Sequence, residues 1–166
     1  MSSPRLLSNT TGVLCLWVGA LVLAVALAQG WHEKNLQNIS FGQGQVTFYP
    51  EGAPPVVLRV DVATTPEAQA RGLMFRQHLA DDEGMLFLFH QPAMQTFWMK
   101  NTPLSLDIIF VGSDGRIINI AAHTTPESEQ TYASLAPATA VVEVRAGLAA
   151  RWGIGPGTRV GYGLGH

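Results

Sequence analysis

The hydrophobic pattern of this chain is one of short, strand-length segments. Between residues 56 and 63, apolar side chains recur at every second position, which is the period of a half-buried strand. Other apolar segments of strand length lie at 46–49, 84–90, 96–100, 106–111, 116–121, 140–145 and 158–162. The pattern therefore predicts seven or eight short strands.

Turn and cap residues divide these segments. The run 112–115 (GSDG) separates two of them and predicts a hairpin. Thr65, Pro66 and Glu67 form a helix start, because Thr caps, Pro suits the first turn and Glu complements the helix dipole. Gly72 is a fitting end for that helix. A second short helix is expected at 147–152.

The strands do not alternate with long helices, which argues against a doubly wound parallel sheet. We expect a mostly β fold with short helices, a compact single-domain β-barrel or sandwich-like body over residues 46–166. Residues 29–45 are mixed and polar, and we interpret them as a linker or edge segment.

The first residues have a different pattern. Arg5 precedes an uncharged apolar run at 13–28, which ends in Ala26-Leu27-Ala28. A basic start, an apolar stretch and an A-x-A end are typical of a secretory signal peptide, so residues 1–28 are predicted to be cleaved after Ala28. The protein would then be exported, to the periplasm or outside the cell. The alternative is a membrane anchor at 13–28, although its 16 residues fall short of the ~20 that span a bilayer.

The charge and the cysteine content limit the classes of partner that the protein could bind. Ten Lys and Arg against twelve Asp and Glu give a net charge of −2, which provides no cationic field for nucleic acid. Membrane contact is expected only through an uncleaved first segment. Cleavage would remove the single cysteine, Cys15, and leave a chain without disulfides. The oligomeric state is open.

The sequence contains few motifs that are typical of catalytic, metal-binding or phosphate-binding sites. The five histidines form no short-spaced ligand pair, and the chain has neither a G-x-S-x-G elbow nor a phosphate-binding glycine loop. The acidic run 81–83 lacks the alternating ligands of a calcium loop. We therefore expect no metal and no cofactor, and the question of catalysis stays open, with a non-enzyme favoured.

The segment 97–102 (FWMKNT) carries the clearest candidate site. As a strand it would place Trp98 and Lys100 on one face, an aromatic plate beside an ammonium group, which suits a sugar ring or a small anion. The alternative is that Trp98 only covers the core.

Five further polar positions are candidates around that face. Asp107 opens a buried strand and needs a partner, for which Arg71 and Arg76 are available. Glu143 lies in mid-strand, either facing solvent or lining a polar face, and His123 follows the hairpin. The candidate ligand-binding set is Arg76, Trp98, Lys100, Asn101, Asp107, His123 and Glu143.

The ordered segments 71–76 (RGLMFR), 84–89 (GMLFLF), 97–102 (FWMKNT) and 106–110 (LDIIF) resemble the motifs of domain-of-unknown-function family 192, also called uncharacterised protein family 0127. The later positions 137–138, 143, 146–147 and 153–154 are similar to its C-terminal pattern. The resemblance implies a compact, mostly β domain, frequently exported, and no established activity or cofactor.

Three functions fit these observations. The first is an exported binding or accessory module for a small-molecule or envelope ligand. The second is a small hydrolase or lyase that uses Asp107 or Glu143 with His123, which requires two titratable side chains in one cleft. The third is a protein-docking module of the cell envelope, which requires an exposed apolar patch.

Overall fold

The computed structural model describes residues 36 and 38–165. The predicted signal peptide at 1–28 and the residues 29–35 of the predicted linker lie outside the described residues, as does Cys15. The chain divides into two compact units, Met1–Asn38 and Ile39–His166, and the second is described below. Among the described residues, no helix combines the length and apolar character needed to cross a bilayer.

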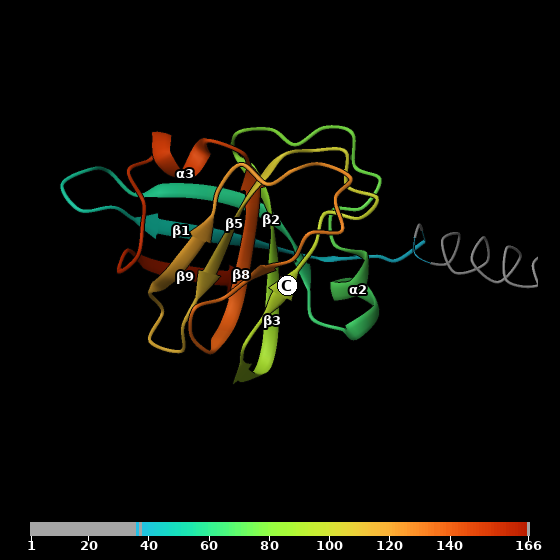
Figure 1. Ribbon diagram of the computed structural model, residues 1–166. Coiled ribbons are helices and arrows are strands. Elements are labelled where there is room, and N and C mark those ends of the chain that lie inside the picture. The colour runs from blue at the N-terminus through green and yellow to red at the C-terminus, as the bar shows by residue number, and fades with distance from the viewer. Residues whose placement is uncertain (1–35, 37, 166) are drawn as a thin grey trace, which may run out of the picture. The chain divides into compact units, whose positions relative to one another are not determined.

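The second unit is built on one curled sheet of seven strands (Figure 1). Its order is β6-β5-β8-β3-β2-β1-β9, and every neighbouring pair is antiparallel except the parallel pair β2 and β3. The strands are β1 (Gly42–Tyr49), β2 (Val56–Ala63), β3 (Glu83–Ala93), β5 (Leu106–Val111), β6 (Ile117–Ala121), β8 (Ala138–Arg145) and β9 (Arg159–Leu164). A separate ribbon pairs β4 (Thr96–Phe97) with β7 (Tyr132–Ala133), and the helices are α2 (Pro66–Arg71) and α3 (Leu148–Arg151).

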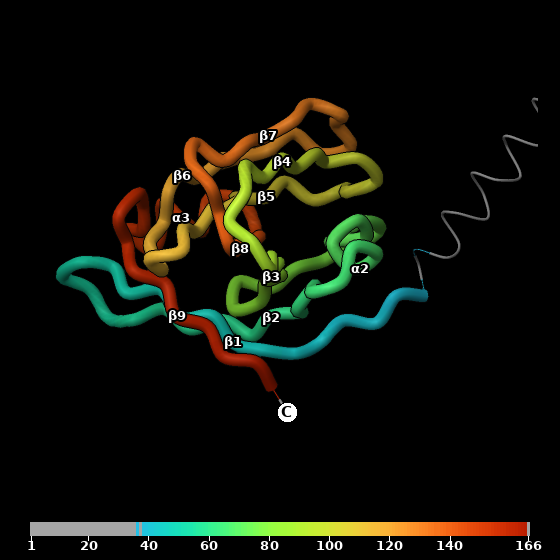
Figure 2. The backbone as a smooth tube through the Cα atoms, turned by 90° about the horizontal axis from the view of Figure 1, so that it is seen from below, coloured from blue at the N-terminus to red at the C-terminus, as the bar shows by residue number. Residues whose placement is uncertain are grey.

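The two outer strands of the sheet meet at one end. The amide of Ile117 donates to the carbonyl of Thr158 at 2.9 Å, and the amide of Val160 donates to the carbonyl of Gly115 at 2.8 Å. Arg116 and Arg159 form an isolated bridge at the same place. The sheet therefore curls into a half-barrel (Figure 2), which confirms the predicted mostly β fold with short helices.

Each face of the sheet carries its own apolar core. The inner core takes side chains from all seven strands and from α3, including Phe48, Leu86, Ile109 and Val142. The outer core lies over β3, β5 and β8 and includes Met85, Phe87, Ile108 and Phe110. The central strands are buried on both faces, so their sequences are continuous apolar runs rather than alternating ones.

The hairpin and both short helices form where the sequence predicts them. In α2, the side chain of Thr65 accepts a hydrogen bond from the amide of Ala68 at 3.2 Å, and the amide of Gly72 donates to the carbonyl of Ala68 at the other end. β5 and β6 pair across the turn at 112–115.

Several strand ends differ from the predictions, and one strand was not predicted. β1 begins at Gly42 rather than Val46, because it pairs with β2 and β9 on both sides despite its polar start. The predicted strand at 96–100 is wrong beyond Phe97, since the amide of Thr102 bonds to the carbonyl of Met99 and turns the chain. β7, which the sequence analysis missed, has only two residues and exists because β4 pairs with it.

Candidate functional site

A small cavity lies on the outer face of the sheet beside Trp98. Its volume is about 40 Å³. It is enclosed by helix α2 and the turn that follows, by β3 and β8 of the sheet, and by the segment after β4. The lining residues are 69–74, Phe87, Phe97, Trp98, Thr102 and Glu143. Four segments far apart in sequence therefore meet at one place.

Glu143 is the buried polar group of this cavity. It lies on β8 opposite Met85 and Ile108, and it is only 4% exposed. Among the described residues, none donates a hydrogen bond to its carboxyl and no cation forms an ion pair with it. Every fully enclosed side-chain nitrogen or oxygen in the described part of the chain has a hydrogen-bond partner. The carboxyl of Glu143 has none among the described residues, so its oxygen atoms are not fully enclosed and open onto the cavity that the residue lines.

Burial controls the protonation of Glu143. It raises the pKa of this carboxyl from 4.5 to about 8, because the low-dielectric surroundings disfavour the charged form. At neutral pH the group is therefore a carboxylic acid, which both donates and accepts a hydrogen bond. The prediction that Glu143 faces solvent is wrong: the side chain is buried and faces a cavity whose walls are partly polar and partly apolar.

Trp98 forms the outer wall of the cavity. Trp98 is 46% exposed. The Nζ atom of Lys100 lies 5.3 Å from the centre of the indole ring and 3.2 Å from a carboxylate oxygen of Glu129. Trp98 and Lys100 thus lie together, as the sequence predicts, but the charge of Lys100 is already paired.

The remaining walls are held rigidly. The guanidinium of Arg71 donates to the carbonyls of Gly72 and Met74 and lies 5.3 Å from the centre of the Phe75 ring. Gly72 has φ of 45°, and a β-carbon there would lie 3.3 Å from the ring of Phe87. Any larger residue at this position would be strained and would press on the cavity wall.

Phe87 and Phe97 complete the apolar side. Their ring centres are 4.9 Å apart and their planes nearly perpendicular, an edge-to-face contact that fixes both rings. The cavity therefore combines rigid aromatic walls, one buried carboxyl and one exposed aromatic plate.

Asp107 lies on the opposite face of the sheet from Glu143. Its carboxylate accepts hydrogen bonds from the amides of His123 (3.0 Å), Gly147 (3.0 Å) and Ala149 (3.1 Å). The predicted partners Arg71 and Arg76 are wrong, because backbone amides satisfy this carboxylate instead. Asp107 therefore fixes backbone, and His123, with φ of 52°, is a turn residue beside it.

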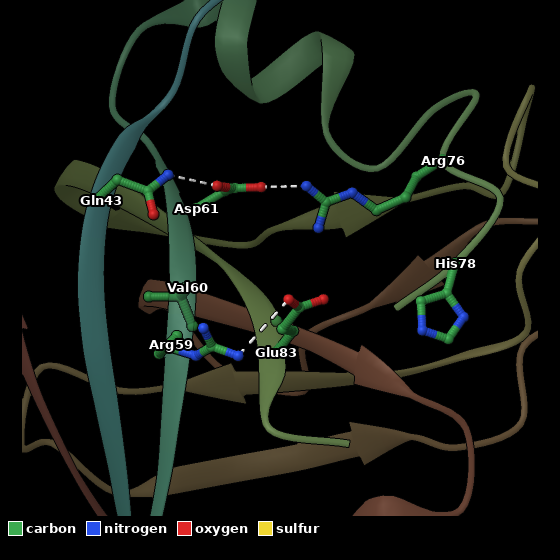
Figure 3. Close-up of a pocket in the computed structure, with 8 residues that line it drawn as sticks. Gln43, Arg59, Val60, Asp61, Arg76, His78 and Glu83 are labelled. Carbon is green, nitrogen blue, oxygen red and sulfur yellow. Dashed lines mark hydrogen bonds and ion pairs between the residues drawn. The ribbon is translucent and has the colours of Figure 1, made fainter. Parts of the chain in front are cut away.

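Arg76 lies in another place, an open groove of about 370 Å³ (Figure 3). Its guanidinium pairs with Asp61, which also accepts a hydrogen bond from Gln43 at 2.6 Å. Arg59 and Glu83 approach to 3.8 Å on the other side of the groove. These groups largely pair with one another.

Asn101 serves the turn after Trp98. It has φ of 53°, and its carbonyl accepts a hydrogen bond from the amide of Phe75 at 2.7 Å. This bond ties the segment that carries Trp98 to the turn that follows α2.

Of the seven predicted site residues, the structure brings Trp98, Lys100 and Glu143 together and places Asn101 in the turn that follows Trp98. Arg76, Asp107 and His123 lie elsewhere. Arg71, Gly72 and Phe87 line the cavity without having been predicted as site residues. They belong to the motif segments 71–76 and 84–89, which were the available signal. Within the described residues, no group of three or more His, Cys, Asp or Glu is arranged to hold a metal ion.

Comparison with known proteins gives a family and structural relatives. The model of a family described as uncharacterized ACR, DUF192, matches residues 47–162. A protein of unknown function from Novosphingobium aromaticivorans is 49% identical, with a TM-score of 0.68, and the match covers 70% of this chain and 83% of that one. No protein with a curated description is significantly similar.

A second solved structure has a comparable fold. It is described as a putative transcription regulator from Sinorhizobium meliloti, is 36% identical and has a TM-score of 0.72. The match covers 75% of this chain and 97% of that one.

Proposed function

The chain belongs to the DUF192 family, and we propose that this member binds a small polar ring compound at the cavity beside Trp98. The observation that carries the proposal is the buried Glu143 carboxyl, which opens onto the cavity and receives no hydrogen bond from the described residues. A buried polar group without a partner is costly, so its presence in the lining of a cavity supports a ligand that completes the hydrogen bonds.

Trp98 supports the second half of the proposal. An exposed indole at the mouth of a cavity offers a flat apolar surface on which a ring can stack. The pairing of Lys100 with Glu129 leaves little free charge there, which favours a neutral ring over an anion. Binding would thus combine stacking outside with hydrogen bonding inside.

Thermal-shift measurements and calorimetry of the full chain with a panel of neutral monosaccharides and sugar acids test this proposal. At least one neutral sugar should raise the melting temperature of the wild type. Trp98→Ala should weaken its affinity at least tenfold because the stacking surface is lost. Tyr162→Ala is the matched control, because Tyr162 is another aromatic residue of similar exposure, 45% against 46%.

Equal affinity of the wild type and Trp98→Ala would refute the site. Failure of every panel member to bind the wild type at millimolar concentration would refute the ring-binding function itself.

We also propose that the protein is exported, on the strength of the basic start, the apolar run at 13–28 and the A-x-A end at Ala28. The mass of the protein recovered from its native host tests this: cleavage after Ala28 gives a chain that begins at Gln29. Recovery of the intact chain from the cytoplasm would contradict it.

A further inference from the structure

The cavity beside Trp98 is too small to admit a ring that would stack on the exposed indole of Trp98. Its 40 Å³ has room for about three water-sized groups. A sugar ring with its hydroxyl groups is several times larger. Only a substituent of the ring can therefore enter, while the ring itself stays outside against Trp98.

The walls restrict the chemistry of that substituent. Phe87, Phe97 and Leu73 form the apolar part of the lining, beside the polar side chains of Gln69, Arg71, Thr102 and Glu143, and this part favours a methyl or methylene group at the tip. A hydroxymethyl group would lose hydrogen bonds against these rings. The substituent therefore has an apolar end and a size of only a few atoms.

Glu143 adds a polar requirement beside those walls. A carboxylic acid donates through its hydroxyl and accepts through its carbonyl. An amide matches both, because its carbonyl accepts from the acid and its N–H donates to it. A carboxylate substituent offers no donor, and it would bring a second acidic group to an already desolvated carboxyl.

We propose that the ligand is an N-acetylated hexosamine, whose acetamido group enters the cavity and whose ring stacks on Trp98. The acetyl methyl lies against Phe87 and Phe97, and the amide pairs with Glu143. The acetyl group has three heavy atoms, which matches the room available. This inference rests on the proposed function, since it names the ring and the group that binds in the same site.

The test is calorimetry of the full chain with glucose, glucosamine, N-acetylglucosamine and N-butanoylglucosamine near pH 6.5. N-acetylglucosamine should bind at least tenfold more tightly than glucose. N-butanoylglucosamine should lose most of that advantage, because the longer acyl chain exceeds the cavity. A ligand series of this kind leaves the protein unchanged, so the comparison does not depend on the folding of a variant.

Two variants locate the effect. Glu143→Gln keeps a donor and an acceptor and should retain the preference for the acetylated sugar. Glu143→Leu removes both and should abolish the preference for the acetylated sugar. Loss of the preference in Glu143→Gln as well would contradict the amide pairing.

Other outcomes separate the two proposals. Trp98-dependent binding with equal affinity for glucose and N-acetylglucosamine would overturn the acetamido inference and leave the ring-binding function intact. Equal binding of the acetyl and butanoyl sugars would also overturn it. An acetyl-lysine peptide that binds as tightly as N-acetylglucosamine would overturn the sugar class. Absence of all binding would refute the proposed function itself.

Discussion

Glu143 shows how strongly a single position is governed by its surroundings. In sequence it is an acidic residue between two valines, a pattern that is typical of a strand with one face in water. In the structure both faces of β8 are covered, by the inner core on one side and by α2 with its following turn on the other. The same alternation that exposes a side chain on a half-buried strand here buries a carboxyl.

The stability of the protein should therefore decrease as the pH rises from about 4.5 to about 8. Within this range the folded state keeps the proton of Glu143 and the unfolded state releases it, so the folded state binds more protons. The loss is about 1.4 kcal/mol per pH unit, on the order of 5 kcal/mol in all, and it stays constant above the folded pKa.

Denaturant unfolding of the wild type and of Glu143→Gln at pH 5, 6.5 and 8 measures this effect. The glutamine variant lacks the titration, so its advantage over the wild type should grow with pH. A difference in unfolding free energy that does not change with pH would show that the carboxyl titrates normally.

At the scale of elements, Asp107 connects three parts of the chain. It is a residue of β5, and its carboxylate holds the turn after β6 through His123 and the start of α3 through Gly147 and Ala149. α3 has only four residues and no side-chain cap of its own, so these bonds from a neighbouring strand replace one.

Asp107→Ala should lower the free energy of unfolding by about 3 kcal/mol or more, because one buried and two partly buried amides lose their acceptor. Asp82→Ala is the control: its carboxylate pairs with Arg59 on the surface at 2.9 Å, and its loss should cost about 1 kcal/mol or less. Chemical denaturation of both variants measures the costs. Similar costs for the two substitutions would contradict the connecting role of Asp107.

At the scale of the whole domain, two cores share one sheet. β3, β5 and β8 contribute to the inner core with one set of side chains and to the outer core with the alternate set. Neither core can open without loss of the strands that form the other. We therefore expect the second unit to unfold as one cooperative body.

Ile108 and Ile109 test this expectation, because they are neighbours in β5, both fully buried, and belong to different cores. Ile108→Ala and Ile109→Ala should each lower the free energy of unfolding by about 2–5 kcal/mol and shift the same single transition. Val57→Ala, at a strand position that is 48% exposed, should have little effect. A transition that splits in two in either variant would show that the cores unfold separately.

Local patterns in the sequence determined the elements of this protein. The period of two in β2, the cap at Thr65, the turn at 112–115 and the strand-length apolar runs each depend on interactions between residues close in the chain. Family membership also follows from ordered short motifs, and the family model confirms it. Local rules failed at β4 and β7, where pairing between distant residues sets the strand ends.

The site depended on tertiary structure. The sequence singled out Glu143 and Trp98. Nothing in it shows that the carboxyl of Glu143 is buried at a cavity on the outer face, whereas the carboxylate of Asp107 binds backbone amides on the inner face. Which face a strand residue occupies, and what covers that face, is decided by the packing of α2 and the segment 97–102 over the sheet. Burial then sets the pKa of Glu143, and so its chemistry, because the energy of a charge depends on everything around it.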